Sequence, residues 1–127
     1  MPFFNFAIFD RPAVSSSANY TFYTMNRLEQ LLKIHQETPE DPFLLFAIAK
    51  EYECMGQIPE ALRWYLDLKR RHPDYVGLYY HLGKLYELLD EADNARQVYQ
   101  EGIQVAKQAG DIHAERELQS ALSWLEA

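Results

Sequence analysis

The chain has 127 residues, of which 48% are hydrophobic and 24% charged, an ordinary composition for one globular domain with a single core. Its 12 basic and 19 acidic residues give a net charge of −7, which disfavours nucleic acid as a partner. No stretch reaches the roughly 18 consecutive apolar residues of a membrane helix, and the lone Cys54 fits a reducing compartment, so we expect an acidic cytoplasmic protein without a membrane segment.

Residues 1–24 form a phenylalanine-rich start. Five of the seven phenylalanines lie there: Phe3, Phe4, Phe6, Phe9 and Phe22. Residues 10–19 mix proline, serine and asparagine without helical periodicity, which predicts a linker. The start lacks the basic region of a secretory signal. Residues 1–24 are therefore either an element that packs on the chain's own helices or on those of a neighbouring copy, or an upstream extension before Met25.

Helical periodicity begins at Met25 and stops before Pro39. One helix side collects the residues at the i, i+3, i+4, i+7 positions: Leu28, Leu31, Leu32 and His35. The second predicted helix starts at Asp41-Pro42, with the aspartate as cap, and runs to Glu53. Gly56 can adopt the left-handed conformation that closes such a helix.

Four more helices are predicted after Gly56. Their ranges are about 59–72, 76–89 and 92–109, the last ended by Gly110, followed by a helix over 111–126 that Asp111 caps. The final helix carries one apolar stripe: Ala114, Leu118, Ala121, Leu122 and Leu125. No strand alternation competes after residue 25, so the fold class is all-α.

A repeat with a period of 34 residues runs through the middle of the chain. The stretch LFAIAKEY at 45–52 aligns with YYHLGKLY at 79–86, so that Lys50 falls on Lys84 and Ala49 on Gly83. The first unit reads Leu45-x2-Ile48-Ala49-x2-Tyr52, then Ala61-x3-Tyr65 and Pro73; the second reads Tyr79-x2-Leu82-Gly83-x2-Tyr86, then Ala95-x3-Tyr99.

These motifs resemble the tetratricopeptide repeat, whose pattern is W-x2-L-G-x2-Y, then A-x3-F, then P. The resemblance covers 42 to about 109 in two full units, and Lys107 departs from it where the closing proline belongs. It implies antiparallel helix hairpins stacked as a short right-handed α-solenoid. The expected domain over 25–127 divides as follows: partial repeat helix 25–39, repeats 42–75 and 76–109, capping helix 111–126.

The physics of helix packing gives the small residues of the repeat a role. Antiparallel helices approach to about 8–10 Å only where small side chains meet, which predicts that Ala49 lies opposite Ala61 and Gly83 opposite Ala95. Large residues are expected to fill the rest of the seam: Leu45, Ile48, Tyr52, Tyr65, Leu68, Leu82, Tyr86 and Tyr99.

The residues between these core positions are expected to face a concave groove. The resemblance implies that such a groove binds an extended peptide or a helix of another protein. The candidate groove residues are Phe43, Phe46, Lys50, Tyr80, His81 and Lys84. The aromatic residues would form apolar pockets, and the two lysines would hold carboxylates of the ligand. Alternatively, each lysine pairs with the glutamate three residues later, Glu53 or Glu87.

No catalytic or metal-binding motif is visible. The sequence has no HExxH, CxxC or GxSxG motif and no glycine-rich phosphate loop, so we predict a protein that is not an enzyme and takes no cofactor or metal. Two functions stay open. One is a protein-interaction module that binds a partner segment in its groove. The other is a self-associating scaffold protein whose residues 1–24 pack on its own or a neighbour's helices, giving a homo-oligomer.

Overall fold

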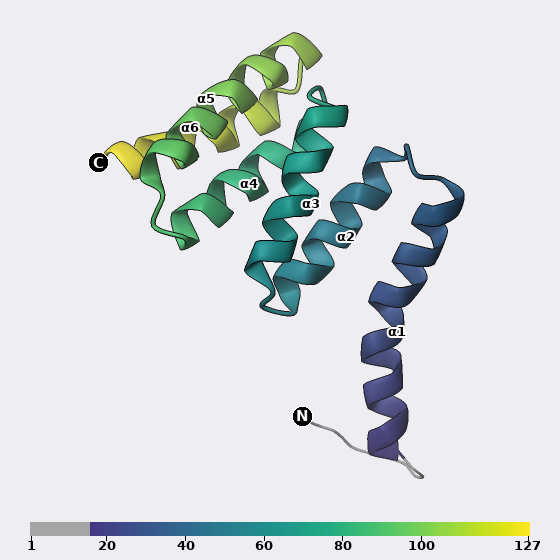
Figure 1. Ribbon diagram of the computed structural model, residues 1–127. Helices are drawn as coiled ribbons and strands as arrows, with labels where there is room; N and C mark the ends of the chain where they lie inside the picture. Colours follow the sequence, from purple (N-terminus) through teal and green to yellow (C-terminus); the bar gives the residue numbers. More distant parts are fainter. Residues whose placement is uncertain (1–15) are drawn as a thin grey trace. The chain divides into compact units, whose positions relative to one another are not determined.

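The computed structural model describes residues 16–127 and the side chains from Arg27 onward. Within this part the chain forms helices and no strand (Figure 1). The helices are α1 Ser16–Glu37, α2 Pro42–Cys54, α3 Ile58–Arg71, α4 Gly77–Leu88, α5 Ala92–Ala109 and α6 Ile112–Glu126. The predicted all-α class is therefore confirmed.

The helix starts and stops follow the local chemistry of the sequence. The Asp41 Oδ1 atom accepts a hydrogen bond from the Phe43 amide at 3.0 Å, and the Asp111 Oδ1 atom accepts one from the Ala114 amide at 3.0 Å. Gly110 ends α5 with φ 72°, in the left-handed region that favours glycine. These polar and glycine signals set the helix ends.

The turn after α4 contains a residue in an unfavourable backbone conformation. Gly56 has φ 78° in the turn after α2, and its equivalent in the second repeat, Asp90, has φ 61°. Because Asp90 carries a Cβ atom, it adopts the left-handed region at a higher free-energy cost than glycine.

We therefore expect Asp90→Gly to stabilise the protein. Relief of this backbone strain, less the added entropy of glycine in the unfolded chain, should raise the free energy of unfolding by about 0.5 kcal/mol. Urea unfolding of the full chain measures it. The matched change in the first repeat, Gly56→Asp, should lower stability, and equal stability of all three proteins would contradict the interpretation.

The first helix differs from the sequence-based expectation. It begins at Ser16, inside the predicted 10–19 linker and upstream of Met25. The chain has no glycine or proline between Pro12 and Pro39, so nothing in that stretch breaks a helix. Serine clusters are also common at helix starts, which periodicity alone does not detect. The prediction that residues 1–24 pack on helices depends on side chains that lie outside the described part of the chain.

The described chain divides into two compact units between Leu44 and Leu45, inside α2. The first unit contains α1 and the start of α2. The second contains the rest of α2 and α3 to α6. Among the described residues, no helix is long and apolar enough to cross a membrane.

The core of the second unit is built on the predicted seam. The small residues Ala49, Ala61 and Ala95 are fully buried, and Gly83 is buried against the Tyr99 ring. Most of the large residues expected there are buried as well: Leu45, Ile48, Tyr65, Leu68, Leu82 and Tyr99. Tyr52 and Tyr86 are only partly buried. Small residues thus let the helices approach, and large ones fill the space beside them.

The last helix completes the stack of the second unit. It packs against both α5 and α4, the preceding first helix of a repeat (Figure 1). Leu118 and Ala121 of the predicted stripe are buried, and Ala114, Leu122 and Leu125 are partly buried. The opposite side of α6 is exposed. The helix therefore covers the apolar edge that two repeats alone would leave open.

Candidate functional site

A tyrosine–glutamate hydrogen bond recurs in both repeats. The Tyr65 hydroxyl of α3 donates to Glu53 Oε1 of α2 at 2.8 Å, and the Tyr99 hydroxyl of α5 donates to Glu87 of α4 in the same way. Both pairs are 12 residues apart in the sequence. Each bond joins the two helices of one repeat and holds the carboxylate of the glutamate three residues after a candidate groove lysine.

Both groove lysines pair with these same glutamates. The Lys50 Nζ atom lies 3.9 Å from Glu53 Oε1, and the Lys84 Nζ atom lies 3.7 Å from Glu87 Oε2. The Lys84 ammonium also lies 5.6 Å from the centre of the Tyr80 ring. The intrahelical pairs that the sequence left as an alternative therefore exist. Carboxylate binding by the lysines stays a prediction.

The buried tyrosines should make stability fall at high pH. Burial, followed by the hydrogen bond to Glu53 or Glu87, raises the pKa of Tyr65 and Tyr99 above the ordinary value. In the unfolded chain a tyrosine ionises near about pH 10, whereas the folded protein keeps both protonated, so their contribution is complete below pH ~10 and falls above it.

We expect the free energy of unfolding to fall by about 1.4 kcal/mol per pH unit for each such tyrosine above pH ~10. Urea unfolding between pH 8 and 12 measures the slope. Tyr99→Phe should remove the contribution of one tyrosine to this slope. The double variant Tyr65→Phe with Tyr99→Phe should remove the contributions of both. A slope that is identical in all three proteins would contradict this assignment.

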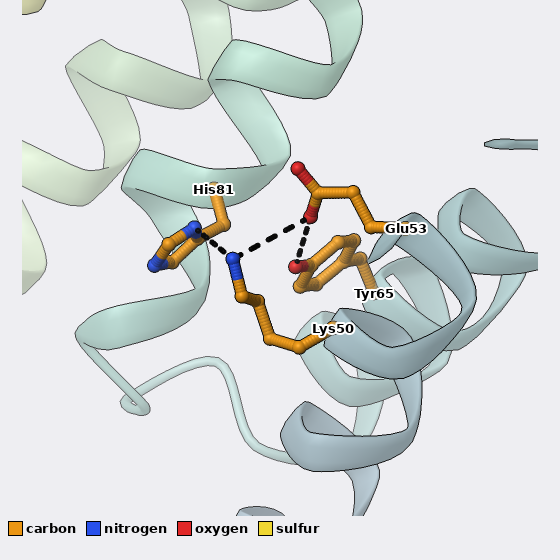
Figure 2. A network of polar contacts seen from close by, with 4 residues as sticks. All are labelled: Lys50, Glu53, Tyr65 and His81. Carbon is orange, nitrogen blue, oxygen red and sulfur yellow. Dashed lines mark hydrogen bonds and ion pairs between the residues drawn. The ribbon is translucent and has the colours of Figure 1, made fainter. Parts of the chain in front are cut away.

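His81 connects the two repeats (Figure 2). The Lys50 Nζ atom lies 3.4 Å from His81 Nδ1, and it also faces Glu53 and the end of the Tyr65 ring. Burial and then the nearby Lys50 charge lower the pKa of His81, and Glu53 and Glu117 partly oppose them. At pH 7 the imidazole is therefore neutral, and its Nδ1 atom accepts the lysine hydrogen bond.

Four aromatic side chains gather around this histidine, and we call the five rings together the aromatic cluster. The His81 ring centre lies 5.3 Å from that of Phe46, 5.7 Å from that of Tyr80 and 6.5 Å from that of Tyr65. The Tyr75 ring contacts Phe46 instead, with 5.6 Å between the two ring centres. Tyr65 is fully buried, while the other four are only partly buried. One ring of the cluster is therefore held in the core, and the other four keep part of their surface accessible to a ligand.

A pocket of about 220 Å³ adjoins the aromatic cluster between α4 and α6. Its lining includes Val76, Tyr80, His81, Ala114, Glu117 and Leu118. Leu118 is buried beneath it, and the side chain of Glu117 is 50% exposed at its edge. Two predicted groove residues therefore line a cavity that α6 helps to form.

The structure brings five of the six predicted site residues into one compact unit: Phe46, Lys50, Tyr80, His81 and Lys84. Phe43 is 61% exposed and belongs to the other unit. Sequence reasoning missed Tyr75, which lies in the turn before α4, and Glu117, because the last helix does not keep the repeat spacing. Two features of the sequence could have indicated them: Tyr75 is an aromatic residue in a predicted turn, and Glu117 is a charged residue directly before the apolar Leu118.

The described residues contain no group of three or more histidine, cysteine, aspartate or glutamate side chains placed to hold a metal ion. The free Cys54 is exposed at the end of α2. What the site offers is aromatic surface, paired charges and one neutral imidazole. These groups suit the binding of a polypeptide segment.

Solved structures of similar proteins identify the repeat. A tetratricopeptide repeat domain protein from Salinibacter ruber is 45% identical, with 69% of this chain and 89% of that chain covered and a TM-score of 0.67. A Bordetella parapertussis protein is 26% identical, with 78% and 86% covered and a TM-score of 0.68. The Sgt2 tetratricopeptide repeat domain from Aspergillus fumigatus, 19% identical with 86% and 72% covered and a TM-score of 0.67, shares the fold.

No protein-family model and no curated protein sequence matches the chain. The similarity to the Salinibacter ruber domain nevertheless covers most of that domain at high identity. The 34-residue period of the sequence and the buried small residues at its equivalent positions are repeat features of this chain itself. The general role of this family is protein interaction. The chain belongs to the tetratricopeptide repeat family.

Proposed function

We propose that residues 45–127 act without catalysis and bind an extended peptide or helical segment of another protein across the aromatic cluster. The observation that carries the proposal is the meeting of Phe46, Tyr80 and His81, which come from two repeats and keep their rings partly exposed. An aromatic surface that is rigid and only partly buried is the type of surface that dominates protein binding energy.

The cluster is held in place before any ligand arrives. The Tyr65 ring lies parallel to the His81 ring, with an angle of 2° between the planes, and its hydroxyl is bound to Glu53. The Lys50 ammonium contacts the imidazole at Nδ1, 3.4 Å away (Figure 2). Because these contacts already fix the rings, little side-chain entropy remains to be lost on binding. This favours a preformed recognition surface.

The proposal predicts that the aromatic side chains carry the affinity. Peptides selected from a random 12-residue library on the full chain should bind Phe46→Ala and Tyr80→Ala at least about tenfold more weakly, because each change removes an interface anchor worth about 1.4 kcal/mol or more. Fluorescence anisotropy with a labelled peptide measures the dissociation constants. Circular dichroism checks that each variant is folded.

The matched control is Leu66→Ala. Leu66 is a large apolar residue of α3 that is 40% exposed and lies outside the aromatic cluster. Its replacement should leave affinity unchanged. Peptides that bind Phe46→Ala and Tyr80→Ala as tightly as the wild type, or that lose affinity only with Leu66→Ala, would overturn the proposal.

A further inference from the structure

The pocket between α4 and α6 has the size of one large side chain. Its volume is about 220 Å³, and an apolar cavity of about 150 Å³ already holds benzene. The pocket therefore has room for an aromatic ring or a branched aliphatic group. Its walls include the Tyr80 ring and the side chains of Val76, Ala114 and Leu118, so most of the lining is apolar.

The titratable side chains of His81 and Glu117 line the pocket. His81 is neutral at pH 7, for the reasons given above, and its Nδ1 atom already accepts from Lys50. Glu117 therefore supplies the negative charge at the pocket edge. Its partner His113 lies 3.9 Å away with a side chain that is 90% exposed, a contact that counts as an ion pair only when the imidazole is protonated.

We propose that this pocket is an anchor subsite for one bulky apolar side chain of the bound segment, and that Glu117 selects a basic residue beside that anchor. The inference rests on the proposed function and adds the chemistry of the partner: a segment with an aromatic or branched aliphatic residue next to lysine or arginine. The wider charge balance agrees, because the chain carries a net charge of −7.

The lysines of the same surface do not reverse this preference. The Lys84 ammonium is paired with Glu87 and lies over the Tyr80 ring, and Lys50 is held by Glu53 and His81. Neither lysine is among the residues that line the pocket. A cation entering beside the anchor therefore meets the Glu117 carboxylate as its nearest charge from the pocket lining.

Four capped dipeptides serve as probes: N-acetyl amides of Phe-Arg, Phe-Gln, Phe-Glu and Ala-Arg. Titration of the isotope-labelled full chain at pH 7.5, followed by NMR, gives the dissociation constants. Phe-Arg should bind about two- to fivefold more tightly than Phe-Glu, as expected for a partly exposed ion pair, with Phe-Gln between them. Ala-Arg should bind at least about tenfold more weakly than Phe-Arg.

Two variants test the two parts of the inference. Ala114→Leu fills the pocket and should abolish Phe-Arg binding, while the matched change Ser120→Leu, on the exposed side of α6, should not. Glu117→Gln should keep Phe binding and remove the difference between Phe-Arg and Phe-Glu. Because Glu117 is half exposed, this second variant is expected to fold even if Ala114→Leu does not.

The His81 ring gives an independent readout. A bound phenyl group removes water from the pocket, so the pKa of His81 should fall when Phe-Arg is added and stay constant with Ala-Arg. Equal affinity for Phe-Arg and Phe-Glu, or an unchanged His81 titration, would overturn the inference. If library peptides still bind across the aromatic cluster of Ala114→Leu with wild-type affinity, the anchor subsite fails and the proposed function stands.

Discussion

Gly102→Ala is expected to lower the free energy of unfolding by about 3 kcal/mol, the upper part of the range for an overpacked core. A Cβ atom at this position would lie 2.5 Å from Tyr79 Cβ and 2.9 Å from Tyr79 Cγ. Because Tyr79 Cβ is fixed to the α4 backbone, no side-chain rotation relieves the contact. Helices α4 and α5 must move apart, and their shared core must loosen.

Urea unfolding of the full chain measures this loss. Alanine normally favours a helix over glycine by up to about 1 kcal/mol, so a loss here identifies the helix crossing as its cause. Gly77→Ala is the matched control, because its added Cβ atom would meet Tyr75 Cε2 at 3.4 Å on an exposed helix end. Equal stability of Gly102→Ala and the wild type would contradict the close packing of α4 and α5.

Gly83→Ala should cost about 2 kcal/mol, for a related but distinguishable reason. Its Cβ atom would lie 2.1 Å from Cε1 of the Tyr99 ring. This ring is fully buried, and its hydroxyl donates to Glu87, so it has little freedom to turn aside. The clash involves a side chain rather than a backbone-fixed atom, and a smaller partner should relieve it.

A double-mutant cycle with Tyr99→Leu separates the two causes. In the background of the Tyr99→Leu variant, Gly83→Ala should cost less than about 1 kcal/mol, whereas Gly102→Ala should keep its full cost. The first repeat offers a natural comparison, since it carries Ala49 at the position equivalent to Gly83. If Tyr99→Leu does not reduce the cost of Gly83→Ala, the ring contact is not its cause.

Much of the fold was predictable because its signals are local or periodic. Asp41 and Asp111 mark helix starts through their side-chain oxygens, and Gly110 marks a helix end through its left-handed backbone. The 34-residue period places Ala49 and Gly83 at equivalent seams. Gly102 was not predictable in this way. A glycine within a helix indicates only weakened propensity, and the need for it arises from Tyr79, a residue of another helix.

The candidate site was predictable in composition but not in its contacts. The spacing of the repeat places Phe46, Tyr80 and His81 on first helices, and the structure brings their rings together. It does not reveal that Lys50 reaches His81 in the next repeat, since such a contact depends on how two hairpins stack. The pocket beside Glu117 depends likewise on the last helix, which leaves the repeat pattern.

The central claim is that a partner segment lies across the aromatic cluster. Intermolecular nuclear Overhauser effects between the isotope-labelled chain and an unlabelled library-selected peptide test it most directly. We predict contacts from the peptide to the rings of Phe46, Tyr80 and His81. Contacts confined to exposed residues outside the cluster, such as Leu66 of α3, would contradict it.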